Sequence, residues 1–250
     1  MSYHHSKYAG NAGDVWKHFC LLETVKGVVA GTGSRSRSYF ESHCGSGWFR
    51  LEEEEEWKRG IGHSKPIPPE LSTTDYFETA FHHLAMREYL GSWRWTESTG
   101  AFSRFFLCDS NPEVIAAAKR ALAEETNFHF AVADGFEKLA TPEKYDFVFI
   151  DPPYVAESPS DWERLQQLLP SLIERQKHFL VWYPIFGKNP ASDVFKGLER
   201  FEIVWDKSPD AKKMVGCGIT GSQPCTAILR NHRALPPLAT WLSASFRYCK

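Results

Sequence analysis

Apolar positions recur along the chain with two periods, one typical of helices and one of buried strands. Between Asn11 and Val29 they follow the spacing of a helix, and glycines at positions 31 and 33 mark its end. Later runs are short and rich in β-branched and aromatic residues, as expected of strands covered on both faces of a parallel sheet. Because helical segments separate these runs, the pattern predicts an α/β fold with a doubly wound parallel sheet. The strands are expected at about residues 37–42, in segments that end at Asp109, Ala133 and Asp151, and at Phe179–Tyr183 and Phe201–Trp205.

The remaining patterns predict elements outside these strands. A helix is expected over Leu165–Ile173, where Pro170 should bend or interrupt it. Val215–Ile219 and Thr226–Arg230 have the apolar character of a hairpin, and Leu238–Phe246 has the spacing of a final helix. An antiparallel last strand is a common addition to such a sheet.

The carboxyl end of one expected strand carries the most informative phrase. Residues 151–154 read Asp-Pro-Pro-Tyr and follow the run Phe147–Ile150, at the end of the strand where open α/β sheets bind their ligands. The two prolines fix the backbone, so the chain leaves the strand stiffly. A carboxylate beside a backbone carbonyl can accept both hydrogens of an exocyclic amine, and a tyrosine offers a flat face to a base. The phrase therefore predicts a site that grips an amino group on a planar ring.

Two further strand ends and a glycine loop predict a cofactor pocket. The segment Glu41–Gly47 reads Glu-x-x-x-Gly-x-Gly, and Gly45 within it lets the backbone approach a ligand closely. Asp109 closes the second strand, where a carboxylate can accept both hydroxyl groups of a ribose. Asp134 follows the third strand and precedes Gly135, where it can meet an adenine ring. These strand ends together predict a pocket for an adenosine-containing cofactor.

The distance between the glycine loop and the ribose acid indicates an insertion. Such an acid usually follows the glycines by about 20 residues, and Asp109 lies much farther along the chain. The excess predicts an inserted, mainly helical subdomain at residues 50–91, with a helix at Asp75–Tyr89. Residues 1–49 and 92–250 then form the main domain.

Composition and charge limit the other possibilities. The 250 residues contain no run of 18 apolar positions and no apolar signal region, so a cytoplasmic protein without a membrane span is expected. The six cysteines form no Cys-x-x-Cys pair, and no His or Cys cluster has ligand spacing, so reduced thiols and no metal site are expected. Because the net charge is −2, a nucleic-acid partner would have to meet a local basic face. Candidates for that face are Lys7, Lys17, Arg35 and Arg37.

Seven short phrases occur in one order along the chain. They are Tyr3–Ser6, Ala9–His18, His43–Gly47, Tyr89–Ser92, Ala133–Phe136, Ile150–Tyr154 and Trp182–Pro184. In this order they resemble the large-subunit (23S) ribosomal RNA adenine-N6 methyltransferase J family, over most of the chain from Tyr3 to about Arg230. The chain departs from the family pattern at Asp109, where a glutamate is expected.

The resemblance implies a Rossmann-like sheet of the class I S-adenosylmethionine-dependent methyltransferases with a small, mainly helical insertion. Residues 1–49 and 92–250 would form the methyltransferase domain, with an N-terminal lid at residues 1–17 and the insertion at 50–91. The implied activity is direct methyl transfer from S-adenosylmethionine to the N6 amine of an adenine in 23S ribosomal RNA. The partner is expected to be RNA free of ribosomal protein at the site, and the enzyme a monomer.

The resemblance and the strand-end phrases together assign roles to individual residues. Asp151 and the Pro152 carbonyl are expected to accept the hydrogens of the amine, and Tyr154 and Lys17 to complete the catalytic group. Substrate RNA is expected to contact Tyr3, Lys7 and Tyr154. The expected cofactor-binding residues are His18, His43, Gly45, Ser92, Asp109, Asp134, Gly135 and Asp151.

Three other functions share part of this pattern. A nicotinamide-dependent oxidoreductase predicts Gly-x-Gly-x-x-Gly, but Trp48, Phe49 and Arg50 follow the second glycine. A nucleic-acid-binding protein without catalysis has no need for Asp151. A DNA adenine-N6 methyltransferase stays open as the nearest alternative, because the same tetrapeptide serves both polymers.

Overall fold

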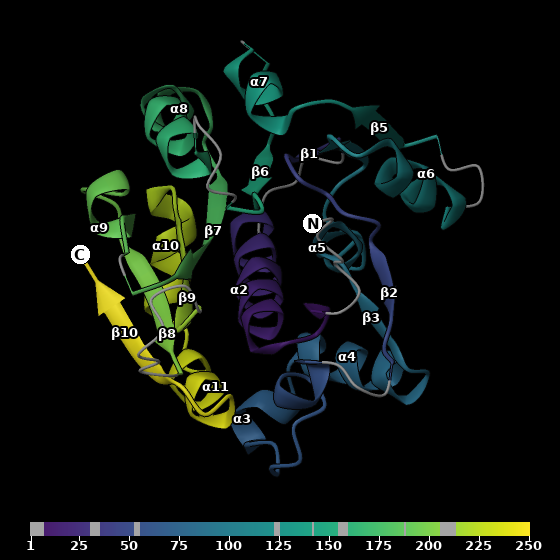
Figure 1. Cartoon of the computed structure of the whole chain (residues 1–250), viewed down its shortest axis with the longest axis vertical. Helices are drawn as coiled ribbons and strands as arrows, with labels where there is room; N and C mark the ends of the chain where they lie inside the picture. The colour runs from purple at the N-terminus through teal and green to yellow at the C-terminus, as the bar shows by residue number, and fades with distance from the viewer. Residues whose placement is uncertain are drawn as a thin grey trace.

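The chain folds around a twisted sheet with helices packed along it (Figure 1). The computed structural model describes residues 8–30, 36–52, 56–122, 126–141, 143–154, 160–187, 189–205 and 214–250. Within these ranges the sheet has eight strands in the order β10-β8-β9-β7-β6-β1-β4-β5. The strands are β1 (Ser38–Glu41), β4 (Arg104–Asp109), β5 (Phe128–Val132), β6 (Phe147–Ile150), β7 (Phe179–Ile185), β8 (Arg200–Val204), β9 (Gly216–Gly221) and β10 (Ser245–Cys249).

The direction of the strands confirms the expected doubly wound α/β sheet. Strands β7, β6, β1, β4 and β5 are parallel neighbours. Strand β9 runs antiparallel between β7 and β8, and β10 runs antiparallel to β8 at the edge. Because the chain passes from β1 to β4 on one side and later places β6 on the other, the strand order reverses at β1. The carboxyl ends of β1 and its neighbours therefore border the crevice where such sheets bind ligands.

Alternate residues of the central strands pack into two separate cores. On one face Tyr39 packs against Phe105 and Phe147, and on the other face Phe40 shares a core with Val148. Helices α2 and α8 lie on opposite sides of β7 in Figure 1. Because both faces are covered, all four residues of β1 are buried and neither side of the strand faces solvent. The first face is covered by α2 (Ala12–Val29), α4 (Asp75–Ala85), α5 (Ser92–Glu97), α6 (Pro112–Arg120), α10 (Gln223–Arg230) and α11 (Leu235–Trp241), and the second by α7 (Gly135–Ala140), α8 (Asp161–Arg175) and α9 (Ala191–Val194).

Helix α2 agrees with the helix expected from Asn11 to Val29. Asn11 caps its first turn, since its side chain accepts the backbone N–H of Asp14 at 2.9 Å. Burial extends beyond the expected face to Trp16 and Leu21, because the helix contacts α5 and α10 as well as β9. The helix is thus fixed on most sides, which gives its first turns a rigid position.

The segment between the glycine loop and α5 begins and ends at neighbouring positions of the main fold. Strand β2 (Trp48–Arg50) pairs with β3 (Glu88–Leu90), and the Gly91 N–H donates to the Gly47 carbonyl at 2.9 Å. Between the two strands lie a 3-10 helix, η1 (Glu56–Arg59), the short α3 (Pro69–Ser72) and α4. The helix expected over Asp75–Tyr89 is too long, because Arg87 adopts a left-handed φ of 58° and the chain continues as β3. The expected inserted subdomain, residues 50–91, falls on this segment.

Two elements expected near the C-terminus are wrong. The segment Thr226–Arg230 belongs to helix α10 and not to a hairpin: a proline lies in the first turn of α10, and two buried residues four positions apart face the core. The final helix expected over Leu238–Phe246 ends at Trp241, because Ser243 has a left-handed φ of 60°. The residues that follow form β10 and pair with β8.

Helix α8 is longer than the expected segment Leu165–Ile173. Ser160 and Glu163 form a reciprocal capping box at its start, which adds a turn before the expected beginning. Pro170 stays inside the continuous helix, so the expected interruption does not occur.

Candidate active site

A cavity of about 400 Å³ lies at the carboxyl ends of the parallel strands. Its walls come from the first turns of α2, the loop after β1, the end of β4, the residues after β6 and the end of β7. A volume in this range suits a small-molecule ligand. The expected site residues in its lining are Lys17, His18, His43, Gly45, Ser92, Asp109, Asp151 and Pro152.

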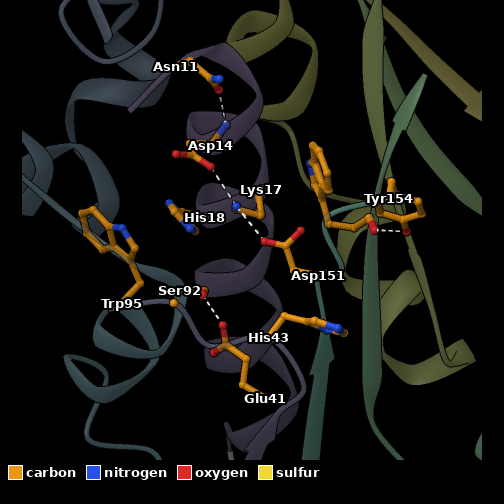
Figure 2. Close-up of polar contacts among 12 residues, drawn as sticks. Asn11, Asp14, Lys17, His18, Glu41, His43, Ser92, Trp95, Asp151 and Tyr154 are labelled. Atoms are coloured by element: carbon orange, nitrogen blue, oxygen red, sulfur yellow. Dashed lines mark hydrogen bonds and ion pairs between the residues drawn. The ribbon is translucent and has the colours of Figure 1, made fainter. Parts of the chain in front are cut away.

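Lys17 lies between two carboxylates at one wall of the cavity (Figure 2). Its Nζ is 2.7 Å from Oδ1 of Asp14, one turn earlier on α2, and 2.8 Å from Oδ2 of Asp151. Asp14 in turn accepts the backbone N–H of Gly10 at 3.0 Å. The three charged side chains therefore join the start of α2 to the end of β6.

Burial and charge fix the protonation of this group. Burial by itself lowers the pKa of Lys17, but the charges of Asp14 and Asp151 outweigh it and raise that pKa above its ordinary value. Burial raises the pKa of Asp14, and the charge of Lys17 reverses the shift and holds it below its ordinary value. The lysine is therefore an ammonium and Asp14 a carboxylate at neutral pH.

His18 is held in a neutral state by its surroundings. Its Nδ1 is 2.9 Å from the Tyr89 hydroxyl, which is itself 2.9 Å from the hydroxyl of Tyr76. The imidazole ring also lies beside Trp95, with the ring centroids 6.3 Å apart. Burial, followed by the positive charge of Lys17, lowers the pKa of His18 to about 3. A neutral imidazole at the cavity wall can exchange hydrogen bonds with a ligand without adding charge.

The glycine loop is tied to the end of β4. The backbone N–H of Gly45 donates to Oδ2 of Asp109 at 3.2 Å, and Oδ1 of the same carboxylate accepts the N–H of Asn111 at 2.9 Å. Gly45 has a φ of 61°, a conformation that side chains disfavour. Asp109 thus orders the loop and also lines the cavity.

Behind the lining, a buried carboxyl group supports Ser92. Glu41 accepts hydrogen bonds from the hydroxyls of Ser92 and Tyr39, the latter at 2.7 Å. Burial raises the pKa of Glu41 to about 8, although both hydrogen bonds favour the charged form. Figure 2 shows the Ser92 side chain directed at this carboxyl group. The hydroxyl at the cavity wall is therefore oriented from behind.

Two aromatic residues stand beside Asp151. Trp182 lines the cavity, and the Nζ of Lys17 lies 5.4 Å from the centroid of its ring. Tyr154 is not part of the lining: its hydroxyl donates to the Trp182 carbonyl, and its ring packs against Trp162 with the centroids 4.8 Å apart. Its φ of 54° is unusual for a residue other than glycine.

Other expected residues are not brought to the cavity wall. Asp134 caps helix α7, where Oδ1 accepts the N–H of Phe136 at 2.9 Å and pairs with Arg164. Gly135 meets a packing need, since a Cβ there would lie 2.0 Å from the carbonyl oxygen of Ser42. Neither residue lines the cavity. Tyr3 and Lys7 lie outside the described residues.

Several lining residues had no expected role. Asp14 could have been found, because a carboxylate three residues before a lysine on a helix is a frequent ion pair. Trp182 lies within an aromatic strand, a pattern shared with ordinary core positions. Nothing in the sequence pattern distinguishes Phe49, Phe186 or Met214, which reach the cavity from strand β2, from the end of β7 and from the segment before β9.

The described residues contain neither a metal-binding cluster nor a membrane-spanning helix. No group of three or more His, Cys, Asp or Glu side chains in the described ranges is placed to hold a metal ion. None of the described helices is long and apolar enough to cross a membrane.

Comparison with known proteins gives a consistent result. A family model described as Ribosomal RNA large subunit methyltransferase D, RlmJ, matches residues 34–244. The chain is 24% identical to Ribosomal RNA large subunit methyltransferase J of Haemophilus influenzae, over 96% of this chain and 93% of that protein. It is 23% identical to the Escherichia coli protein of the same name, over 80% of this chain and 75% of that protein.

A solved structure has the same fold. Protein LPL1258 from Legionella pneumophila superimposes with a TM-score of 0.74 at 21% identity, over 97% of both chains. Together with the strand order and the methyltransferase family match, this confirms the expected Rossmann-like class I methyltransferase sheet.

Proposed function

Because the chain belongs to the family of Ribosomal RNA large subunit methyltransferase D, RlmJ, we propose that it methylates the N6 amine of an adenine in 23S ribosomal RNA. S-adenosylmethionine is the methyl donor. The observation that carries the choice of an exocyclic amine is the position of Asp151 and Pro152 in the cavity wall, with Lys17 bound to the carboxylate. RNA as the substrate is supported by the names of the relatives.

The cavity has the groups that this cofactor requires. Asp109 offers a carboxylate to the ribose hydroxyls, at the strand end where such acids bind them. Gly45 brings the backbone close without a side chain, and neutral His18 and Ser92 supply hydrogen bonds to the polar end of the cofactor. The bound cofactor supplies a methyl group on a positively charged sulfur, which an amine can attack. Asp134 and Gly135, which do not line the cavity, are proposed to approach the adenine ring of the cofactor.

Asp151 and the Pro152 carbonyl are proposed to accept the two hydrogens of the target amine. The nitrogen lone pair of adenine is spread into the ring, which makes it a poor nucleophile. Two acceptors on its hydrogens draw the nitrogen toward tetrahedral geometry and localise the lone pair for attack. Lys17 contributes by holding the Asp151 carboxylate in one orientation through their ion pair.

Two aromatic rings are proposed to hold the target base. Trp182 lines the cavity beside Lys17, and Tyr154 lies against it with the ring centroids 6.1 Å apart. Tyr154 does not line the cavity, and we propose that it supports one side of the base pocket through its contact with Trp182. Since the base must leave its stack to reach Asp151, these rings replace the stacking that it loses.

We assign residues 1–49 and 92–250 to the methyltransferase domain and residues 50–91 to an insertion. Residues 1–17 are proposed to act as a lid through which Tyr3 and Lys7 contact RNA. The proposal is supported by Asp14 and Lys17, which belong to the first turns of α2 and line the cavity.

The test is the fate of a radiolabelled methyl group from S-adenosylmethionine. Protein-free 23S ribosomal RNA, assembled large ribosomal particles and duplex DNA are offered in parallel, and the digested product is analysed for N6-methyladenine. We expect label in N6-methyladenosine of the protein-free RNA, and less in the particles. Label on another atom would overturn the N6 assignment, and preference for DNA would overturn the choice of polymer.

A further inference from the structure

A second cavity, of about 480 Å³, lies at the amino ends of the parallel strands, opposite the active-site cavity. It is bordered by the residues just before β1, β6 and β7 and by the last turn of α2, at Val28 and Val29. The same helix lines the active-site cavity with its first turns. From Lys17 to Val28 the helix rises roughly 16 Å, which separates the two cavities.

Positive charge dominates the lining of this second cavity. It contains Arg37, Lys144, Arg175 and Lys177, against one acid, Asp146. Oδ2 of Asp146 accepts the backbone N–H of Ser38 at 2.7 Å and its hydroxyl at 2.9 Å, so the acid holds β1 in place. An excess of cations in one cavity contrasts with a whole chain whose net charge is −2.

Two of these cations are available to a partner. Arg175 is committed to the fold, because its guanidinium donates to the carbonyls of Leu139 and Thr141. Lys144 and Lys177 are exposed, and neither forms an ion pair with a described acid. Burial, and also the charge of Lys177, lower the pKa of His178, whose Nδ1 lies 3.1 Å from the carbonyl of Asp146. The exposed positive charge of the lining is therefore that of the two lysines, since Arg37 is half-buried.

From this arrangement we infer that the second cavity is a phosphate-binding groove that anchors the backbone of the substrate RNA away from the target adenine. The inference rests on the proposed function, which supplies the polyanion. Two exposed lysines in the lining of one cavity suit a chain of phosphates, because each can neutralise a phosphate and release its counterion. A protein with a small net negative charge needs such a local cationic site to hold RNA. Of the four residues expected to form a basic face around the active-site opening, Arg37 lines this second cavity and Lys17 is bound to two acids. The other two, Lys7 and Arg35, lie outside the described residues.

The test compares two double variants with the same change in charge. Lys144→Ala/Lys177→Ala removes the accessible cations of the groove. Lys119→Ala/Lys196→Ala removes two exposed lysines that line neither cavity. Binding is measured by fluorescence anisotropy over a range of salt concentrations. One RNA is a short, unmethylated stem-loop that contains the target adenine, as mapped from the label in 23S ribosomal RNA. The other extends that stem-loop on both sides.

The wild type should bind the extended RNA at least about tenfold more tightly than the short one, and the groove variant should lose this advantage. Each phosphate contact contributes about 0.7–0.9 to the slope of log K against log salt, so loss of two contacts should reduce the slope for the extended RNA by about 1.5. The control variant should keep the advantage. Melting temperatures of both variants show that they are folded.

Three results have distinct meanings. If both variants lose the same affinity for the extended RNA, the groove is not an anchor and the inference falls. If the groove variant loses binding of ADP while its RNA binding is unchanged, the site belongs to a small phosphorylated molecule and the RNA anchor is overturned. If the wild type methylates neither RNA, the proposed function fails, an outcome separate from any effect of the lysines.

Discussion

At the scale of single residues, the active-site cavity combines groups of fixed charge with one group whose charge depends on pH. Lys17 is held charged by Asp14 and Asp151, and His18 is held neutral by burial and by the charge of Lys17. Glu41 differs, because its pKa of about 8 lies near neutrality. The hydroxyl of Ser92 is hydrogen-bonded to that carboxyl group. Protonation of Glu41 behind the cavity therefore affects a group that lines it.

The first prediction concerns Glu41 and pH. Its pKa rises on folding from 4.5 to about 8, so the folded chain binds the extra proton, and the associated stability is lost as pH rises between these values. Glu41→Gln, which stays neutral, should be relatively more stable than the wild type at pH 8 than at pH 5. The change should be on the order of a few kcal/mol or less. Melting temperatures across this pH range check it, with exposed Glu174→Gln as the control. A parallel pH profile for all three proteins would contradict it.

The second prediction concerns Asp151. Asp151→Ala should reduce methylation by at least about 10²-fold, the usual scale for losing a positioned polar group in the transition state, with cofactor affinity within about tenfold. Lys17 keeps its contact with Asp14 in this variant, so the fold should persist. Single-turnover rates and calorimetry measure the two quantities, and exposed Asp193→Ala is the control. Full activity in the variant would refute the proposed mechanism.

The charged residues of the site can be predicted from the sequence more easily than the residues that position or surround them. Asp151 and Asp109 stand at strand ends, where the fold places ligands, so pattern alone located them. Tyr154 was expected as a stacking face, but its hydroxyl bond to Trp182 turns it out of the lining, a contact across 28 residues that no local pattern encodes. The sequence motif includes Glu41 as its first residue. Its raised pKa could not be predicted, because it depends on burial by segments far apart in sequence.

At the scale of elements, the approach of α7 to the loop after β1 depends on a residue without a side chain. A Cβ at Gly135 would lie 2.0 Å from the backbone carbonyl of Ser42, and backbone cannot move aside as a flexible side chain can. His43 follows Ser42 and packs its ring against Phe136 of α7, with the centroids 5.2 Å apart. The helix start and the cavity loop are therefore one packed unit.

The third prediction follows from this contact. Gly135→Ala should destabilise the protein by about 1–3 kcal/mol or more, the usual cost of overpacking, and should weaken cofactor binding through the displaced His43. Gly100→Ala is a suitable control, because a Cβ there has no neighbour within 4 Å and the cost is limited to its φ of 63°. Urea unfolding and cofactor titration provide the comparison. Equal losses in the two variants would show that the close approach is not critical.

Helices and strands are predicted correctly where the spacing of apolar residues matches the faces that become buried. They are predicted poorly where a short apolar run is compatible with either a helix or a strand. Strand β6 reads as a strand in sequence and in the fold, because both of its faces are covered. Thr226–Arg230 was read as a strand, although the proline at the start of α10 and the spacing of Cys225 and Leu229 fit a helix. An antiparallel last strand is among the expectations, but the sequence pattern does not give its place, because β10 pairs with β8 across about 45 residues.

At the scale of the whole molecule, the active-site cavity forms only when distant parts of the chain meet. Lys17 and Asp151 are 134 residues apart in sequence, and Asp109 is 64 residues from Gly45. The sequence pattern predicts the doubly wound sheet that brings these residues together. It does not predict the second, cationic cavity. Its lysines precede β6 and β7, and only the parallel arrangement of these strands places them side by side.

The fourth prediction concerns the folded chain as a binding unit. S-adenosylmethionine at about 100 times its dissociation constant should stabilise the protein by about 2.7 kcal/mol, or roughly 5–10 °C in Tm for a chain of this size. NADH should leave Tm unchanged, since the glycine loop lacks a third glycine at the spacing that dinucleotides require. Differential scanning calorimetry with both compounds decides. Stabilisation by NADH alone would contradict the cofactor assignment.

The burial of α2 on most of its sides has a consequence for how the protein is made. During synthesis α10, which covers this helix, follows it by about 200 residues, which takes on the order of 10–40 s at ordinary translation speed. During that interval Trp16, Phe19 and Leu22 lack their final neighbours, so the nascent chain is a substrate for chaperones that bind apolar segments. Limited proteolysis of ribosome-arrested chains should cut within Ala12–Val29 until α10 has emerged, and early protection there would show that the helix finds cover sooner.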